Sequence, residues 1–183
     1  MLYLIIALVV LALIGMSLYN GLIKSKVKVD NAWSDIAVFL KKRYDLIPNL
    51  VSTVKGYAAH ESQTLERVIA ARNQAINSNG ASVSDVAASQ QALSSGIRSI
   101  FALSENYPDL KANTNFIELQ NSLKEIETDL SSARRYYNAT VRDYNTTIQS
   151  VPQVFIANAM KLQEREFFEL EDQAETKNIK VEF

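Results

Sequence analysis

Hydrophobic residues follow two different patterns along this chain of 183 residues. Residues 1–23 form one continuous apolar run, in which 19 of the 23 residues are apolar and none is charged. A helix of this length rises about 34 Å, enough to cross a hydrocarbon core of roughly 30 Å. The remaining 160 residues hold all 39 Lys, Arg, Asp and Glu residues, and their apolar positions recur at helical spacing. The pattern predicts a membrane helix followed by a helical domain.

The apolar run is predicted to be an uncleaved anchor rather than a cleaved secretory signal. No basic residue precedes it, and no Ala-x-Ala cleavage site follows it. Lys24, Lys26 and Lys28 come directly after it, and residues 24–43 carry a net charge of +4. The positive-inside rule then predicts an outside N-terminus and a cytoplasmic domain. The three lysines are also candidates for contact with anionic lipid headgroups.

Four long helices are predicted after the anchor, at about 27–58, 62–77, 84–104 and 116–148, with a short apolar segment at 154–160. Pro48 falls inside the first, so that stretch is either one bent helix or two helices meeting near residues 45–48. The apolar stripe continues in phase across the proline, which favours one bent helix. Nothing breaks the chain between Ile23 and Val27, so the membrane helix can continue into it.

The helix at 116–148 has the clearest pattern. Its apolar residues follow spacings of three and four over 33 residues, close to a coiled-coil repeat. Asn115 and Glu118 have the spacing of a capping box at its start, and Ser82 and Asp85 are a similar start for the preceding helix. The predicted seam consists of Phe116, Leu119, Leu123, Ile126, Leu130, Ala133, Tyr137, Val141, Tyr144 and Ile148.

The predicted fold class is all-α. A single N-terminal transmembrane helix continues into an elongated antiparallel bundle of about four long helices and a short C-terminal helix. The predicted divisions are an anchor at 1–23, the bundle at 24–160 and a charged tail at 161–183 with net charge −3. Phe167 and Phe168 in that tail are expected to pack back or to bind a neighbour.

The chain offers little material for catalysis. It has no cysteine and one histidine, His60, which is expected at a turn between two helices. A transition-metal site, a cofactor and a small-molecule substrate are therefore not predicted, and no phosphate-binding or nucleophile motif is present. Arg134 and Arg135 precede two tyrosines, but the domain has no basic face, so nucleic-acid binding is not predicted.

Several stretches together resemble the LemA family of bacterial membrane proteins. They include Val29–Ile36, Leu40–Val51, Val54–Glu61, Val68–Arg72, Glu105–Asn113, Ala133–Asn138 and Tyr144–Asn145. The resemblance implies a helical bundle behind one membrane helix with its N-terminus outside, and hence a single-pass protein of the bacterial inner membrane. It implies no catalytic residue. A magnetosome protein involved in vesicle formation belongs to the same family, which suggests membrane-organising roles.

The most specific stretch contains Arg43, Tyr44, Asp45, Pro48 and Asn49. A proline inside a helix frees one backbone carbonyl. Arg43, Asp45 and Asn49 could satisfy that opened turn, or they could contact a partner or a sister subunit.

The predicted function is a non-enzymatic, membrane-anchored scaffold that acts through protein–protein interaction or self-association. Its expected partners are membrane lipid and further copies of the chain or another membrane protein. The alternatives are an accessory or regulatory domain of a membrane-bound enzyme, for which His60, Arg43 and Asp45 are the candidate site residues, and a protein that remodels the membrane surface.

Overall fold

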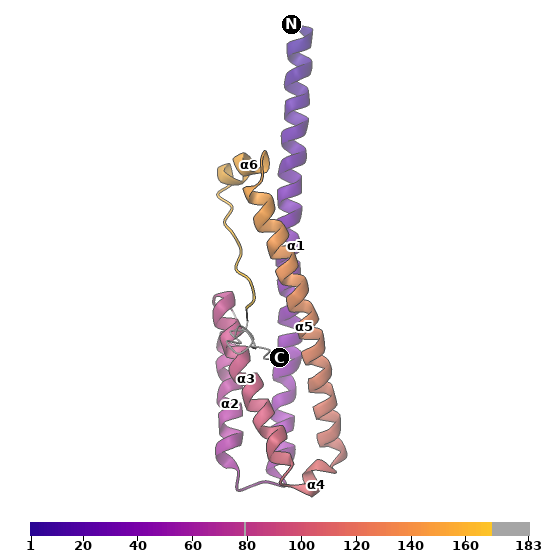
Figure 1. Ribbon diagram of the computed structural model, residues 1–183, viewed down its shortest axis with the longest axis vertical. Coiled ribbons are helices and arrows are strands. Elements are labelled where there is room, and N and C mark those ends of the chain that lie inside the picture. Colours follow the sequence, from indigo (N-terminus) through magenta and orange to yellow (C-terminus); the bar gives the residue numbers. More distant parts are fainter. Residues whose placement is uncertain (79, 170–183) are drawn as a thin grey trace, which may run out of the picture. The chain divides into compact units, whose positions relative to one another are not determined.

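The computed structural model describes residues 1–78 and 80–169, and no strand occurs among them. The predicted all-α class with a long apolar N-terminal helix is confirmed (Figure 1). The helices are α1 (Leu2–Lys55), α2 (Ser62–Asn77), α3 (Val83–Ser104), α4 (Pro108–Lys111), α5 (Thr114–Gln149) and α6 (Gln153–Ala159).

Helix α1 is continuous over 54 residues and contains Pro48. The prediction of one helix rather than two is therefore confirmed, as is the direct continuation of the apolar run into the bundle. None of residues 2–19 is buried, whereas Leu22 is fully buried and begins the buried stripe of α1. Among the described residues, α1 is the helix long and apolar enough to cross a membrane.

The chain divides into two compact units. Unit 1 comprises Met1–Lys41 and Glu127–Phe167, and unit 2 comprises Lys42–Ile126 and Phe168–Phe183. In unit 1, α1 and α5 run antiparallel: Lys28 meets Asp143 at 4.0 Å, and five residues further along α1 the ring of Trp33 lies 5.3 Å from that of Tyr137. The buried side chains of unit 1 include Leu22, Val29, Ala32, Ile36, Leu130, Tyr137, Val141, Tyr144 and Ile148.

In unit 2, α2 and α3 pack side by side along their lengths (Figure 1). A Cβ atom placed on Gly96 of α3 would lie 3.1 Å from Cγ2 of Val68 on α2, so the glycine lets the two helices approach closely. The rings of Phe101 and Phe116 meet edge to face at 6.1 Å and join α3 to α5. This packing is what the predicted apolar stripes require, because each helix buries one face.

The predicted seam of α5 agrees with its burial. Seven of its ten residues are buried and the other three are half-buried. The predicted capping box is wrong, however, because the helix begins one residue before Asn115. The side chain of Asn113 instead accepts a hydrogen bond from the backbone N–H of Phe116 at 3.0 Å, which is the capping geometry. The predicted cap of α3 is confirmed, since Ser82 Oγ accepts from the N–H of Asp85 at 3.1 Å.

The connection between α3 and α5 contains the short helix α4, which the sequence pattern did not indicate. Pro108 is its first residue, a position where proline is favoured because no N–H is needed there. The predicted short helix after Pro152 is present as α6, and the Val151–Pro152 peptide bond is cis. The predicted tail, 161–183, begins with Lys161 in the turn after α6 and continues with non-helical residues 162–169, while residues 170–183 lie outside the described part.

Candidate functional site

The three predicted lipid-binding lysines lie on the turns of α1 that follow the first buried residue, Leu22. Lys24 and Lys28 are exposed and Lys26 is half-buried. The ammonium group of Lys28 lies 4.0 Å from the carboxylate of Asp143 and 5.9 Å from the centre of the Tyr136 ring. The lysine side chains therefore start about one turn beyond the exposed apolar segment.

Lys24 and Lys28 also line an open groove of about 340 Å³ on the surface of unit 1. Ammonium groups beside apolar side chains suit a ligand with an anionic head and an apolar body, as a phospholipid has. The groove is lined by Ile23, Lys24, Val27, Lys28, Asn31, Ala32, Asp35 and Tyr136.

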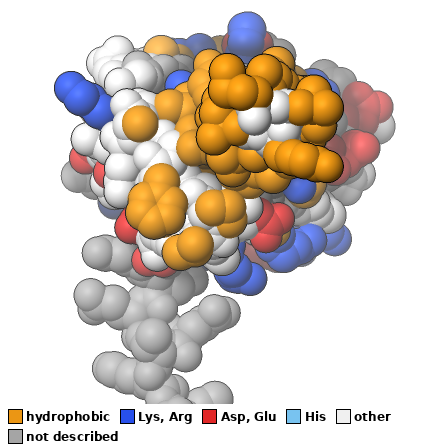
Figure 2. Space-filling view, turned by 90° about the horizontal axis from the view of Figure 1, so that it is seen from above, with side chains coloured by type: hydrophobic (Ala, Val, Ile, Leu, Met, Phe, Trp, Pro, Cys, Tyr) orange, Lys and Arg blue, Asp and Glu red, His pale blue; other side chains and the backbone are white. Residues whose placement is uncertain are grey.

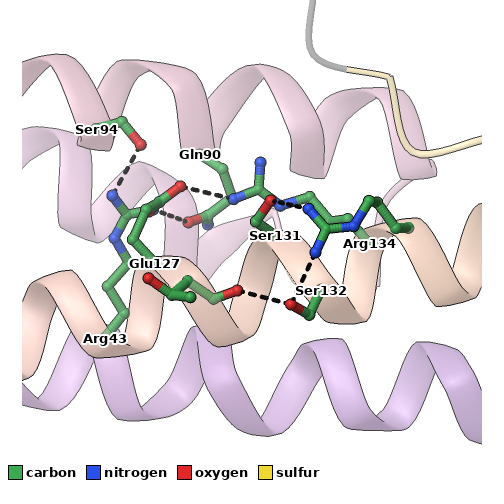
Figure 3. Close-up of polar contacts among 9 residues, drawn as sticks. Arg43, Gln90, Ser94, Glu127, Ser131, Ser132 and Arg134 are labelled. Atoms are coloured by element: carbon green, nitrogen blue, oxygen red, sulfur yellow. Dashed lines mark hydrogen bonds and ion pairs between the residues drawn. The ribbon is translucent and has the colours of Figure 1, made fainter.

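Arg43 and Tyr44 point into unit 2 and join α1 to α2 and α3. The guanidinium of Arg43, with 4% of the residue exposed, donates to Ser94 Oγ at 2.8 Å and to Gln90 Oε1 at 3.5 Å (Figure 3). The Tyr44 hydroxyl donates to the carbonyl of Ala75 at 3.3 Å and accepts from Gln90 Nε2. Burial raises the pKa of Tyr44 above its usual 10.0, although the hydrogen bond from Gln90 and the charge of Arg43 oppose that rise.

The carbonyl that Pro48 frees is that of Tyr44, four residues earlier. Arg72 on α2 satisfies it: its Nε donates to the Tyr44 carbonyl oxygen at 2.8 Å. The sequence suggested that Arg43, Asp45 and Asn49 could satisfy this carbonyl, but the residue that does so is Arg72. The sequence pattern placed Arg72 on α2 but contained nothing to pair it with a carbonyl 28 residues away.

The remaining motif residues lie on the surface of unit 2. Asp45 and Asn49 are exposed on α1, and Asn49 lines an open groove of about 440 Å³ together with Asn115 and Glu118 of α5. His60 is exposed in the turn between α1 and α2, as predicted. Arg43 is buried while Asp45 and His60 are exposed, so the three candidate residues for an enzymatic site do not share one environment.

A feature that the sequence pattern missed lies on α5 in unit 1, where residues 163–166 run as a non-helical strip along the helix. The side-chain amide of Asn145 makes two hydrogen bonds to the backbone of Arg165. Its Nδ2 donates to the Arg165 carbonyl at 3.0 Å, and its Oδ1 accepts from the Arg165 N–H at 2.9 Å. The Tyr144 hydroxyl donates to the carbonyl of Gln163 at 3.2 Å, and the Tyr137 hydroxyl donates to that of Glu166 at 3.0 Å.

Two side-chain contacts flank these backbone contacts. The Arg165 guanidinium pairs with the Asp30 carboxylate of α1 at 2.8 Å, and Gln149 donates to the Glu164 carboxylate at 2.7 Å. Four of these bonds reach backbone groups of the segment and two reach its side chains, so most of these contacts do not depend on which side chains the segment carries. We name residues 163–166 the docked segment. The sequence clues were Tyr137 and the pair Tyr144–Asn145, which lie in stretches that carry the family resemblance.

Burial raises the pKa of Tyr137 and of Tyr144, whose hydroxyls hold the docked segment. The Arg165 guanidinium opposes that rise in both cases, and the Asp30 carboxylate adds to it. Both tyrosines therefore keep their protons near neutral pH and can donate to the carbonyls. Of the aromatic pair expected to pack back or to bind a neighbour, Phe168 is buried and Phe167 is exposed.

Comparison with known proteins supports the resemblance noted in the sequence. A family model described as the LemA family matches residues 32–183. A protein named Protein LemA from Metamycoplasma hominis is 26% identical over 130 residues, which cover 70% of this chain. The aligned region covers 58% of that relative's own length.

Proposed function

The chain belongs to the LemA family, and from that membership and the geometry above we propose that it is a membrane-anchored, non-enzymatic scaffold that binds other polypeptides, foremost a second copy of itself. Residues 2–19 would anchor it in the bilayer, because a helix with no buried residue and no charge there is stable in hydrocarbon. The helices beyond Leu22 would form the interacting part.

The docked segment on α5 is the observation that carries the proposal. Hydrogen bonds to backbone groups recognise an extended polypeptide largely without regard to its sequence. A helix face that presents Asn145, Tyr144 and Tyr137 in this way is therefore suited to holding a polypeptide segment, from this chain or from another.

Self-association would follow if the docked segment of one copy bound α5 of a neighbour. Exchange of an identical element between copies needs no new complementary surface, since every contact made within one chain can be made between two. Residues 150–160 would act as the connection that allows the exchange. Confinement to one membrane would raise the effective concentration of the neighbouring copy.

Cysteine cross-linking tests this proposal, because the chain has no cysteine of its own. The side-chain ends of Gln149 and Glu164 meet at 2.7 Å, so the shorter side chains of Gln149→Cys and Glu164→Cys place two thiols within reach of a short bis-maleimide linker. The two single variants, carrying different tags, are expressed together in the same membranes and then treated with this linker. We expect a covalently linked heterodimer.

Two matched controls define the result. Val38→Cys is an exposed position of α1 in unit 1, eight residues beyond Asp30, and should give little product with Glu164→Cys. Adding Asn145→Ala should reduce the specific product, because the docked segment loses two backbone bonds. If Gln149→Cys and Glu164→Cys cross-link only when both are in one chain, and the protein is monomeric in mild detergent, the self-association proposal is wrong.

The orientation is a second part of the proposal. Lys24, Lys26 and Lys28 favour a cytoplasmic bundle at the bacterial inner membrane by the positive-inside rule. A protease added to intact spheroplasts should leave a C-terminal tag uncut and should cut it after lysis. Cleavage in the intact spheroplasts would place the bundle on the outside.

A further inference from the structure

Helix α6 and the turn before it expose large hydrophobic side chains that nothing in unit 1 covers. Val151 is 75% exposed and Phe155 is 69% exposed, whereas Ala157 on the other side of the helix is 2% exposed. Residues 150–160 contain no charged residue, and Lys161 follows them directly. The segment thus has an apolar outer face, a buried inner face and a basic residue at its end.

The register of α1 against α5 gives the position of α6 along α1. Lys28 meets Asp143, and the two helices are antiparallel. Helix α5 ends at Gln149, six residues after Asp143, and six residues before Lys28 on α1 is Leu22. Because both helices rise about 1.5 Å per residue, α5 ends opposite Leu22 and α6 follows at that end of unit 1.

Leu22 is also where the exposed apolar segment of α1 gives way to the buried stripe. Residues 2–19 rise about 27 Å, close to the thickness of a hydrocarbon core. A bilayer around them would have its surface near Tyr19 to Leu22, the position along α1 that α6 occupies. Figure 2 looks down on this end, and hydrophobic side chains lie on the surface beside the apolar column of α1.

We propose that α6 with the Val151–Pro152 turn is a second membrane contact, which lies in the headgroup region and places Val151 and Phe155 in the lipid. The inference rests on the proposed anchoring by α1 but goes beyond it. Aromatic and aliphatic side chains on a short uncharged helix are suited to the boundary between headgroups and acyl chains. Lys24 and Lys28, a turn or two further along α1, and Lys161 would meet the phosphates there.

A second contact has a consequence that one anchor does not. A single transmembrane helix can rotate about its own axis without changing its burial in lipid. A short apolar helix held to one side of it fixes which face of unit 1 is turned toward the membrane. The groove that contains Lys24 and Lys28 would then have a fixed orientation relative to the headgroups.

Environment-sensitive labels on single cysteines test the proposal. Phe155→Cys, Val38→Cys and Leu8→Cys are each labelled with the fluorophore NBD in the full-length protein, which is then reconstituted into phosphatidylcholine–phosphatidylglycerol vesicles. Phe155 and Val38 are both exposed in unit 1, but Val38 lies about 27 Å further along α1 from Asn20 and serves as the matched control. Leu8 lies in the apolar segment and reports on anchoring itself.

We expect the label at position 155 to be blue-shifted and quenched by shallow nitroxide lipids, and the label at position 38 to be quenched by aqueous iodide. Iodide quenching at position 155 equal to that at position 38, with lipid quenching at position 8, would overturn the inference and leave the anchor intact. Loss of lipid quenching at position 8 would overturn the anchoring proposal instead. Shielding at position 155 that disappears when the protein is diluted in lipid would show that a second copy covers α6, and would also overturn the inference.

Discussion

Arg72 replaces the backbone hydrogen bond that Pro48 removes from α1, and this contact can be tested quantitatively. The Nε donor lies 2.8 Å from the Tyr44 carbonyl, and the arginine is half-buried. A hydrogen bond with a charged donor contributes about 1.5–3 kcal/mol net. Because Arg72 is partly solvated, we expect Arg72→Met to lower the free energy of local unfolding, here called the opening free energy, of α2 and the end of α1 by about 1–2 kcal/mol.

The specific expectation concerns the combination with Pro48→Ala. An alanine at this position restores an N–H that can reach the Tyr44 carbonyl, so that Arg72 is no longer the donor on which this carbonyl depends. In the Pro48→Ala background, Arg72→Met should therefore lower the opening free energy by no more than about 0.5 kcal/mol, the range of ordinary surface changes. The two substitutions should be coupled by roughly 1 kcal/mol, as is typical of residues that share a partner.

Hydrogen exchange followed by mass spectrometry on the full-length protein in detergent measures this effect locally. A change of 1–2 kcal/mol corresponds to exchange that is about 5- to 30-fold faster in peptides from α2 and from the end of α1. Arg67→Met is the matched control, since Arg67 is an exposed arginine of α2 that bonds within its own helix at 3.2 Å. Equal effects of Arg72→Met in the proline and alanine backgrounds would refute the reasoning.

Three further predictions concern both units. Gly96→Leu should lower the opening free energy of α2 and α3 by about 1–3 kcal/mol in the same exchange measurement, because even a Cβ there meets Val68 at 3.1 Å, and Val68→Ala should restore part of the loss. The folded protein binds the Tyr44 proton more tightly than the unfolded chain, so the stability that this group contributes is complete below pH 10.0 and is lost as the pH rises through the raised pKa. In thermal melts, the melting temperature of Tyr44→Phe should therefore fall less at alkaline pH than that of the unchanged protein. Asn145→Ala should speed tryptic cleavage after Arg165, as followed by mass spectrometry, and an unchanged rate would mean that the Asn145 bonds do not hold the docked segment.

The helices were predictable because their burial follows a repeating pattern. The predicted boundaries of α2 agree with the structure, and the α5 seam from Phe116 to Ile148 is buried or half-buried throughout. A periodic apolar stripe predicts which face of a helix is buried, whichever element packs against that face. The cap of α5 was placed two residues late because Asn113 and Asn115 are both suitable caps, and sequence alone does not rank them.

Two contacts between a side chain and a distant backbone group were not predictable, for a physical reason. Arg72 meets the Tyr44 carbonyl, and Asn145 meets the backbone of Arg165. Each is a side chain bonded to a backbone group far away in the chain, and a backbone carbonyl is the same for every residue. Only the side-chain partner of such a contact must be a particular residue type, because any residue supplies the backbone group. The sequence therefore contains no pair of matching side chains that would indicate the contact.

The continuity of α1 has a mechanical consequence for the protein at a membrane. Transmembrane helices adjust their tilt when the bilayer becomes thinner or thicker. No turn or linker separates residues 2–19 from Leu22 and the rest of α1 in unit 1. A change in tilt would therefore turn the α1 segment of unit 1 through the same angle and move its surface relative to the headgroups. In this geometry the thickness of the bilayer becomes a variable to which unit 1 can respond without binding any ligand.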